Sequence, residues 1–396
     1  MPRTKWSDDT FLDELRHGAD PQADEAVARL YALHTGEQRI ITFFAALRHN
    51  DSVVAETAPE PLRQFLVDTR TPPPADSLGD LELGARAFRA NSLPAVVVLL
   101  ASSLPRGYGA PCLNRILAIS GNLSKHPYQR LMGVVQLLVN ISDDQAFADG
   151  GRAIITAQKL RLLHAGIRLV ARSRPPADLP ARDSVPVNLE DMLATIMAFS
   201  SLVVDGLERL RCPMRPGDAE AFYALWREFA RLMGIYPPGK PQDTSLVPAT
   251  LSEAREFYAS YVRRNNVAVP QTASDAWRSN ALGCQLTQEN LVMMRRLLPW
   301  QARALGLGLA PRLAMTDLMA TDELTRVGIT PLLGRGPLRA VLHRVLALGQ
   351  WAGTHDTFVG KLAHAILQGM VDVDRRGEVE FAIPFRREDL LGPAFR

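Results

Sequence analysis

The feature that most constrains this chain is the spacing of its apolar residues. Along nearly all of its 396 residues they recur every three or four positions, which is typical of amphipathic α-helices. Proline and glycine interrupt these runs, and we find no alternating run long enough to form a strand of a sheet core. The pattern predicts an all-α fold, a large bundle-like domain in which many helices pack, as in globins, around a buried pocket.

The periodicity and its breaks place the helices approximately. Pro59 and Pro61 open one helix, because proline is well tolerated in a first turn. Asn188 caps another, which we expect to run to about Leu210. The stretch over residues 103–111 holds two prolines and two glycines and predicts a strong break. Further helices are expected over residues 40–47, 78–90, 130–141, 153–171 and 218–233.

The segment Tyr-Pro-Pro-Gly-Lys-Pro, over residues 236–241, is the strongest candidate for a boundary within the chain. Residues 1–19 are expected to form an N-terminal extension and residues 20–235 the helical core that carries the pocket. Residues 236–371 would form a second helical part packed on that core, and residues 372–396 a charged tail.

Composition excludes several classes of function. The chain has 45 Lys and Arg against 42 Asp and Glu, and its basic residues are spread out, so no nucleic-acid surface is predicted. Its three cysteines, Cys112, Cys212 and Cys284, lie far apart and form no C-x-x-C pair. A thiolate zinc site and a disulfide scaffold are therefore not expected, and a reducing compartment fits best.

The chain also lacks the patterns of export and of stable membrane insertion. Its N-terminus has no apolar stretch typical of a secretion signal and no twin-arginine motif. The most apolar stretch, from Leu93 to Leu104, is about 12 residues, which is too short to span a bilayer and predicts a buried helix. We therefore expect a cytoplasmic protein.

The helix expected over residues 153–171 carries an unusual residue. On a helical wheel Lys159 lies near the middle of the apolar arc, between Ile155, Leu162 and Gly166. A buried ammonium is unfavourable by several kcal/mol unless it is paired or its pKa falls, and such groups are concentrated at functional sites. The alternatives are that Lys159 extends to the edge of the helix or pairs with a buried carboxylate. Gly166, two turns further on, leaves room for another helix or for a planar cofactor.

One histidine and one methionine are candidate metal ligands. His164 lies at the border of the same arc, where it is either a core histidine or a ligand. In the helix expected over residues 188–210, Met197 lies at the edge of the buried face and is either a packing residue or a thioether ligand. The wheel of that helix places Ser200 on the buried face and turns Glu190, Asp191, Asp205 and Glu208 toward water.

Motifs of other enzyme classes are missing. The sequence contains no phosphate-binding G-x-x-x-x-G-K-[ST], no dinucleotide-binding G-x-G-x-x-G after a strand, no G-x-S-x-G and no H-E-x-x-H. A di-iron bundle would require two Glu-x-x-His motifs, and this pair is absent because the motif occurs once, at Glu14 to His17.

The order of several segments resembles the rubber-oxygenase family, also called MpaB-like oxygenases, which includes latex-clearing protein. The two most specific segments are Thr156-Ala-Gln-Lys-Leu-Arg-Leu-Leu-His-Ala-Gly-Ile-Arg168 and Asn188-Leu-Glu-Asp-Met-Leu-Ala-Thr-Ile-Met-Ala-Phe-Ser200. Shorter matches run in order from residue 20 to about residue 235, and a weaker one spans residues 317–328. They include Asp20-Pro21-x-x-Asp24, His49-Asn-Asp, Pro61-Leu-Arg-Gln-Phe-Leu, Ser103-Leu-Pro-x-x-Tyr108, Gly150-Gly-Arg and Asp218-Ala-Glu-Ala-Phe-Tyr-Ala-Leu-Trp226.

The resemblance implies an all-α fold that holds haem b and uses O2 to cleave carbon–carbon double bonds of isoprenoid chains. It implies a catalytic role for Lys159, which matches a lysine on the haem-facing helix, and for Arg168 of the same helix. It also implies a cofactor pocket at His164, Met197, Gly166, Leu163 and Ser200, with His164 or Met197 on the iron.

Two positions depart from the rubber-cleaving pattern. Met197 stands where those proteins carry the proximal histidine, and Leu160 stands where they carry a threonine. We therefore expect a haem-dependent oxygenase of a small apolar unsaturated molecule, isoprenoid or lipid-like. The alternatives are a haem enzyme of another reaction type, such as a monooxygenase or desaturase, and a non-catalytic binder of apolar ligands. The sequence gives no indication of an oligomeric state.

Overall fold

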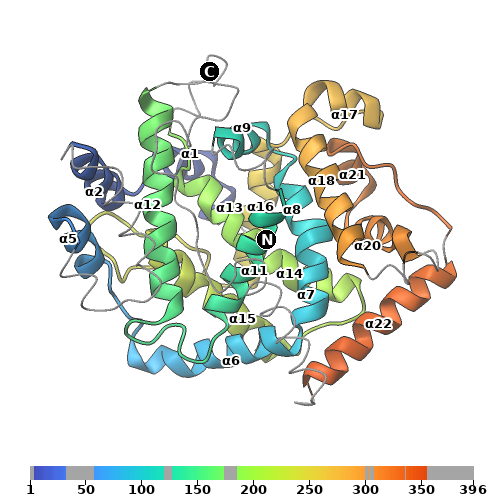
Figure 1. Cartoon of the computed structure of the whole chain (residues 1–396), viewed down its shortest axis with the longest axis horizontal. Coiled ribbons are helices and arrows are strands. Elements are labelled where there is room, and N and C mark those ends of the chain that lie inside the picture. The colour runs from blue at the N-terminus through green and yellow to red at the C-terminus, as the bar shows by residue number, and fades with distance from the viewer. Residues whose placement is uncertain are drawn as a thin grey trace.

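The computed structural model describes residues 4–32, 58–119, 127–173, 185–298, 303, 307–334 and 336–354 (Figure 1). Every regular element within these residues is a helix, which confirms the predicted all-α fold. The α-helices are α1 Asp9–His17, α2 Pro21–Ala32, α5 Glu60–Asp68, α6 Leu78–Ala90, α7 Ser92–Val98, α8 Leu104–Gly107, α9 Pro111–Ile119, α11 Pro127–Ile141, α12 Arg152–Ser173, α13 Leu189–Phe199, α14 Ser201–Arg209, α15 Pro216–Leu232, α16 Leu251–Asn265, α17 Ala273–Ser279, α18 Ala281–Leu297, α20 Ala310–Leu318, α21 Thr321–Arg326 and α22 Gly336–Thr354. Short 3₁₀-helices η1 Lys5–Ser7, η2 Ala75–Ser77 and η5 Leu307–Leu309 and a π-helical turn η3 Leu99–Ser103 complete the set.

Local sequence explains where several helices begin. The predicted cap at Asn188 is present, because its side-chain oxygen accepts a hydrogen bond of 2.9 Å from the backbone N–H of Asp191. Pro61 lies in the first turn of α5, as predicted, and α6 covers the predicted residues 78–90. Thr272 opens α17 with a capping box, in which its hydroxyl and the Asp275 carboxylate satisfy each other's backbone N–H groups.

Two predicted boundaries were wrong. The helix expected over residues 188–210 is divided at Ser200, whose φ of −116° and ψ of −86° interrupt the helical path between α13 and α14. The hydroxyl of Ser200 donates to the carbonyl of Ile196 at 2.7 Å, so the serine bonds back to the preceding turn at the point of the break. The break expected over residues 103–111 begins later, because the helical path continues through η3 and α8 to Gly107.

One hydrophobic cluster dominates the interior. It includes buried side chains from Trp6 to Leu346, so segments on both sides of residue 236 contribute to it. The aromatic residues of α15 lie at its centre, where Trp226 stacks on Phe199 of α13 at 5.3 Å between ring centroids. The apolar stretch over residues 93–104 is largely buried within it, as predicted. The division of the chain at residues 236 and 372 remains a prediction.

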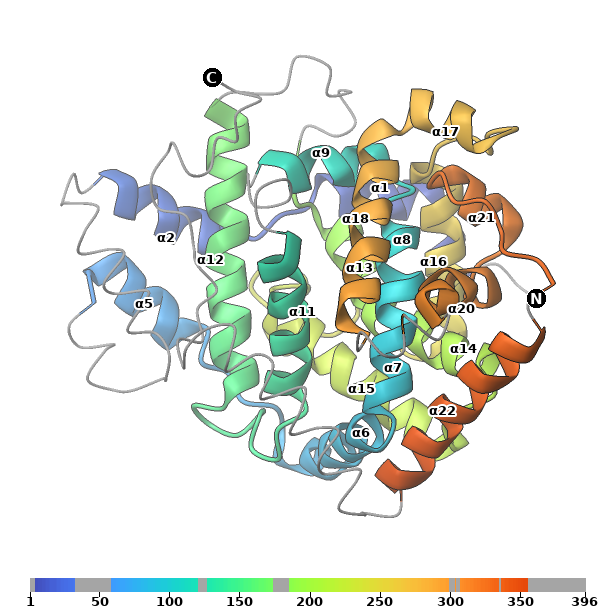
Figure 2. The same cartoon turned by 45° about the vertical axis from the view of Figure 1, so that its right-hand side comes forward.

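The arrangement around α12 matters most for function. Figures 1 and 2 show α12 standing between the pair α2 and α5 on its outer side and α11 and α13 on its inner side. A second cluster of apolar side chains joins α2, α5 and α12, and it includes Leu30, Phe65 and Leu162. Helix α12 is thus held from outside by α2 and α5 and forms one wall of the interior.

In the described part of the chain, no single helix is long and apolar enough to cross a bilayer. The helical stretches Ala75–Ala90 and Ser92–Gly107 reach that length and composition only together, and they meet at a bend of 81°. The helix predicted over residues 40–47 and the charged tail predicted over residues 372–396 lie outside the described residues.

Candidate functional site

Helix α12 brings Lys159 and Gly166 onto one face. They are seven residues apart, which is two turns of helix. Lys159 is only 6% exposed, as the helical wheel predicted for a residue in the apolar arc. A Cβ atom added to Gly166 would meet no heavy atom of the described residues within 4 Å, so the space beside this glycine is open. Leu163, between the two along this face, is half-buried.

Gly79, Gly217 and Gly336 are equally open but lie exposed in the first turns of their helices, whereas glycines in helix interiors elsewhere are crowded. A Cβ atom at Gly206 of α14 would lie 2.3 Å from Val98, and one at Gly84 of α6 would lie 2.3 Å from the carbonyl oxygen of Ala221. Those glycines permit close packing of neighbouring elements. Gly166 has no such neighbour among the described residues, so the first alternative for it, contact with another helix, receives no support from them.

The opposite face of α12 carries two buried arginines. Arg161 forms a two-pronged ion pair with Asp20, with Nε to Oδ2 at 2.6 Å and Nη2 to Oδ1 at 3.0 Å. Arg168 donates from Nε to Asp24 at 2.6 Å and from Nη1 to the carbonyl of Val187 at 3.1 Å. Burial disfavours the charge of Arg161, yet the carboxylate of Asp20 raises the pKa of its guanidinium above the ordinary value. Both arginines therefore tie α12 to the N-terminal end of α2.

His164 lies on the inner side of α12, away from the face of Lys159 and Gly166. The side chain is half-buried, and its Nδ1 is sealed from solvent without a hydrogen-bond partner among the described residues. Burial, and then the positive charge of Arg168, lower the pKa of His164 to about 3. The imidazole is therefore neutral near pH 7, which is the form that binds metals.

Met197 is completely buried in α13. Its sulfur lies 3.9 Å from the hydroxyl oxygen of Tyr223, and that hydroxyl donates a shorter bond of 2.8 Å to the carbonyl of Pro248. Burial raises the pKa of Tyr223, so the phenol stays protonated. The surroundings of Met197 are those of a packing methionine, and its role as a ligand remains a prediction. Ser200 uses its hydroxyl within its own helix, as described above.

A residue that sequence reasoning missed is exposed in the middle of α13. Ten of the eleven residues of this helix are buried all around its circumference, and Thr195 alone is exposed. Its hydroxyl donates to the carbonyl of Asp191 at 2.9 Å. Thr195 and Met197 are about 200° apart around the helix, so the exposed position lies on the face away from Met197. The sequence offered one sign of it, a lone hydroxyl side chain within an apolar stretch.

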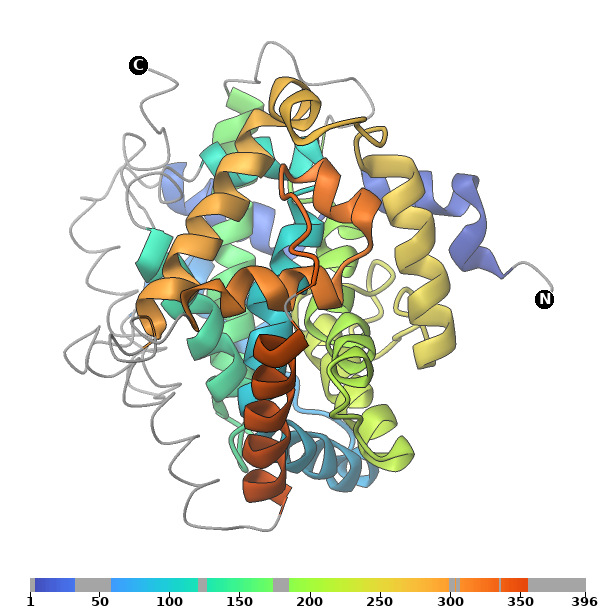
Figure 3. The same cartoon turned by 90° about the vertical axis from the view of Figure 1, so that its right-hand side faces the viewer.

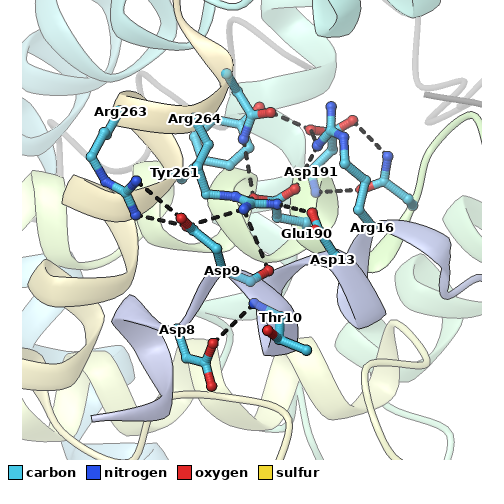
Figure 4. Close-up of polar contacts among 12 residues, drawn as sticks. Asp8, Asp9, Thr10, Asp13, Arg16, Glu190, Asp191, Tyr261, Arg263 and Arg264 are labelled. Carbon is cyan, nitrogen blue, oxygen red and sulfur yellow. Dashed lines mark hydrogen bonds and ion pairs between the residues drawn. The ribbon is translucent and has the colours of Figure 1, made fainter. Parts of the chain in front are cut away.

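The first turn of α13 is fixed by a network of charges (Figure 4). Arg16 of α1 contacts Glu190 at 2.6 Å and Asp191 at 3.3 Å. From α16, Arg264 contacts Glu190 at 3.0 Å, and the hydroxyl of Tyr261 donates to Asp191 at 3.0 Å. The expectation that Glu190 and Asp191 face water was wrong, because both carboxylates are buried and contact these partners.

The outer part of the same network reaches the surface. Arg263 and Arg264 donate hydrogen bonds to the carboxylate of Asp9, which lower its pKa to about 2. Arg264 also contacts Asp13, so α1 and α16 are joined by several charge pairs. Together these contacts position the start of α13 from two sides.

The described residues contain no group of three or more His, Cys, Asp and Glu side chains that could hold a metal ion. A metal carried by a macrocycle needs only one or two protein ligands, so this finding does not bear on haem. The structure gathers Lys159, Leu163 and Gly166 on one face of α12, whereas His164 and Arg168 lie elsewhere on that helix and Met197 and Ser200 lie at the C-terminal half of α13.

Comparison with known proteins identifies the family. Residues 87–351 match the family described as ER-bound oxygenase mpaB/B'/Rubber oxygenase, catalytic domain. The chain belongs to this family. The match covers about two thirds of the chain and includes α12 and α13 with all the predicted site residues.

Two relatives agree with this assignment. The chain is similar to the Rubber oxygenase of Streptomyces sp. (strain K30), with 22% identity over 246 residues, which are 59% of this chain and 59% of that protein. It also resembles the structure of Latex Clearing Protein LCP in the closed state, with a TM-score of 0.65 and 17% identity over 92% of this chain and 91% of the other. The second likeness supports the fold, and the resemblance stated from sequence is confirmed.

Proposed function

We propose that this chain is a haem b-dependent oxygenase that uses O2 to oxidise or cleave a carbon–carbon double bond of a small apolar molecule, isoprenoid or lipid-like. Membership of an oxygenase family supports the reaction class. The observation that carries the proposal is the face of α12 on which a buried lysine and an open glycine lie two turns apart. Such a face offers a flat surface for a planar group and a positive charge at its edge.

The residues present are compatible with haem. The open space at Gly166 would admit a ring system against the helix backbone, and Thr195 leaves an exposed position on α13. His164 supplies a neutral imidazole, whereas the sulfur of Met197 already lies against Tyr223. Neither side chain lies on the face of Lys159 and Gly166, so the iron ligand, His164 or Met197, stays a prediction that the variants below test. When bound, haem would supply the one-electron and O2 chemistry that side chains lack.

The protein would contribute a positive charge and the exclusion of water at the site. Lys159 would present N–H donors and a positive charge to a polar oxygen atom, and its burial strengthens that interaction because little water screens it. Leu160 and Leu163 are half-buried apolar neighbours that would line the substrate region and exclude water. Arg168 would act indirectly, since its ion pair with Asp24 holds the helix that carries Lys159.

A second candidate is a haem enzyme of another reaction type. Leu160 favours it, because an apolar side chain here removes the hydroxyl that the rubber-cleaving members carry next to the lysine. This candidate shares the cofactor and differs in the product, so a product assay separates the two.

The experiment is an absorption spectrum of the purified protein, oxidised, reduced with dithionite, and reduced with carbon monoxide. We expect a Soret band that shifts with carbon monoxide, and we expect His164→Ala to weaken or move it. Met315→Ala is a matched control for Met197→Ala, because both methionines are fully buried and Met315 lies on α20. A featureless spectrum after expression with ample haem precursor would refute the proposal and favour a non-catalytic apolar-ligand binder.

The product assay uses squalene as probe under labelled O2. Carbonyl products that carry the label would support cleavage of a double bond. Hydroxylated or dehydrogenated products, or turnover of none of the probe by a haem-loaded protein, would favour the second candidate. Lys159→Met, which keeps the length and removes the charge, should retain the Soret band and lose most of the turnover.

A further inference from the structure

The outer face of α22 carries a row of exposed apolar side chains. Val341, Val345, Leu348 and Trp351 are 44%, 52%, 65% and 56% exposed. Their spacing of four, three and three residues places them on one stripe of the helix. Leu333, just before the helix, is exposed as well. Single exposed apolar residues are ordinary, but a contiguous stripe marks an interaction surface.

The stripe is not the result of a loosely attached helix. The inner face of α22 packs closely on α6 and α7, since a Cβ atom at Gly349 would lie 2.6 Å from Leu93 and one at Gly353 would lie 2.3 Å from the carbonyl oxygen of Ala90. The side-chain amide of Gln350 donates to Asn91 at 2.7 Å and to the carbonyl of Cys212 at 2.9 Å. Figures 2 and 3 show α22 along the outer edge of the molecule, with α6 and α7 behind it.

Helix α22 itself carries two arginines and one histidine and no acidic residue. From Leu324 to His355 the sequence contains four arginines and no aspartate or glutamate. Arg344 is exposed beside the stripe, whereas Arg339 pairs with Asp317 at 2.8 Å and Arg326 with Asp322 at 3.0 Å. In a chain with 42 acidic residues, their absence over this stretch leaves the surface suited to an anionic partner.

We propose that the outer face of α22 docks on an anionic lipid membrane and lies in the plane of its surface. An apolar stripe, a tryptophan near one end and an exposed arginine on a helix without acidic residues are the combination that interfacial helices use. A second copy of the chain is a weaker fit, because a stable dimer buries about 800 Å² on each partner and four side chains of one helix cover much less. The proposal goes beyond the proposed function and does not depend on haem.

The test is flotation of the full chain with vesicles of phosphatidylcholine, with and without about a third phosphatidylserine, at low and high salt. We expect binding to the anionic vesicles that weakens with salt. The variant Val345→Glu/Leu348→Glu should bind at least about tenfold more weakly, because it removes two apolar contacts and adds two charges of the lipid's sign. The control Val67→Glu/Val292→Glu makes the same change at residues 60% and 45% exposed on α5 and α18 and should bind as the natural chain does.

A second readout reports on the helix itself. Vesicles whose acyl chains carry bromine should quench tryptophan fluorescence. Trp351→Phe should remove most of the quenching, since Trp6 and Trp226 are buried and Trp277, which is 39% exposed, lies on α17 far from α22 (Figure 1). The proposal is wrong if the chain does not float with anionic vesicles, or if the α22 double variant binds as well as the control. It is equally wrong if the natural chain sediments as a dimer that the α22 variant converts to a monomer, with no lipid binding by either.

Discussion

The buried ion pair between Arg161 and Asp20 allows a sharp test of what holds α12 in place. Both side chains are 3% exposed, and two N–H···O contacts of 2.6 and 3.0 Å join them. The substitution Asp20→Asn keeps the shape and removes the charge, which leaves a buried guanidinium with weaker contacts to Gln22 at 3.0 Å and Tyr236 at 3.2 Å. Breaking a buried pair by removing one partner costs about 3–5 kcal/mol, and we expect the lower end because asparagine still accepts one hydrogen bond.

The measurement is urea unfolding followed by circular dichroism, with the free energy of unfolding compared at unchanged slope. Asp149→Asn is the matched control, because Asp149 forms the same two-pronged contact with Arg70 at the surface, where the side chains are 63% and 39% exposed. An exposed pair contributes about 0–1 kcal/mol, so the control should lose little. If Asp20→Asn lowers the free energy of unfolding no more than Asp149→Asn does, the pair does not anchor α12.

A double-mutant cycle separates the pair from its surroundings. Asp20→Ala and Arg161→Met should each be strongly destabilising, while the double variant should lose clearly less than their sum, with a coupling of about 2 kcal/mol or more. A side chain at Gly234 would also disturb this ion pair. Its φ is +87°, and a Cβ atom there would lie 3.1 Å from Asp20 and 3.2 Å from Arg161. If the losses of the two single variants simply add up in the double variant, Asp20 and Arg161 do not stabilise the fold as a pair.

Three further predictions follow from local environments. Gly166→Ala should raise the free energy of unfolding by up to about 1 kcal/mol, because helix propensity improves in open space, whereas Gly206→Ala should lower it; equal effects in thermal unfolding would contradict this. The pKa of Asp9 is lowered to about 2, so its stabilisation is present above its ordinary pKa of 3.8 and is lost as the pH falls toward 2; Asp9→Asn should flatten the stability profile there. The pKa of His164 is lowered from 6.5 to about 3, so the unfolded chain binds the proton first and the free energy of unfolding falls as the pH drops below about 6.5. If His164→Asn shows the same fall in the free energy of unfolding with pH, His164 is not its source.

The sequence predicted best what depends on one helix at a time. Helix α6 and most of α12 follow directly from apolar periodicity, and the wheel placed Lys159 in a buried arc, where the structure has it. It failed for Glu190 and Asp191, since their partners Arg16 and Arg264 are 174 and 74 residues away from Glu190 and a wheel represents one helix only. Burial of a carboxylate is decided by what other segments bring to it.

The exposure of Thr195 could not be predicted from the sequence for a related reason. A wheel sorts residues into apolar and polar positions, and Thr195 is a small polar residue that fits either side. Whether such a residue is covered depends on how closely the surrounding helices approach, which the residue types of α13 alone do not determine. The break at Ser200 could not be predicted for the same reason. Serine is compatible with a helix interior, and its hydrogen bond back to Ile196 at the break is visible in the structure alone.

The two opposite faces of α12 have different roles, but on each face the two important residues are seven positions apart. Arg161 and Arg168 are seven residues apart and bind two carboxylates at the start of α2, whereas Lys159 and Gly166 are seven residues apart on the opposite side. Two anchors separated by two turns prevent the helix from rotating about its axis, since a rotation would break both buried pairs at once. The face of Lys159 is therefore fixed in direction without any contact that would cover Gly166. This explains why the Asp20-Pro21-x-x-Asp24 segment accompanies the α12 segment, since each carboxylate matches one arginine.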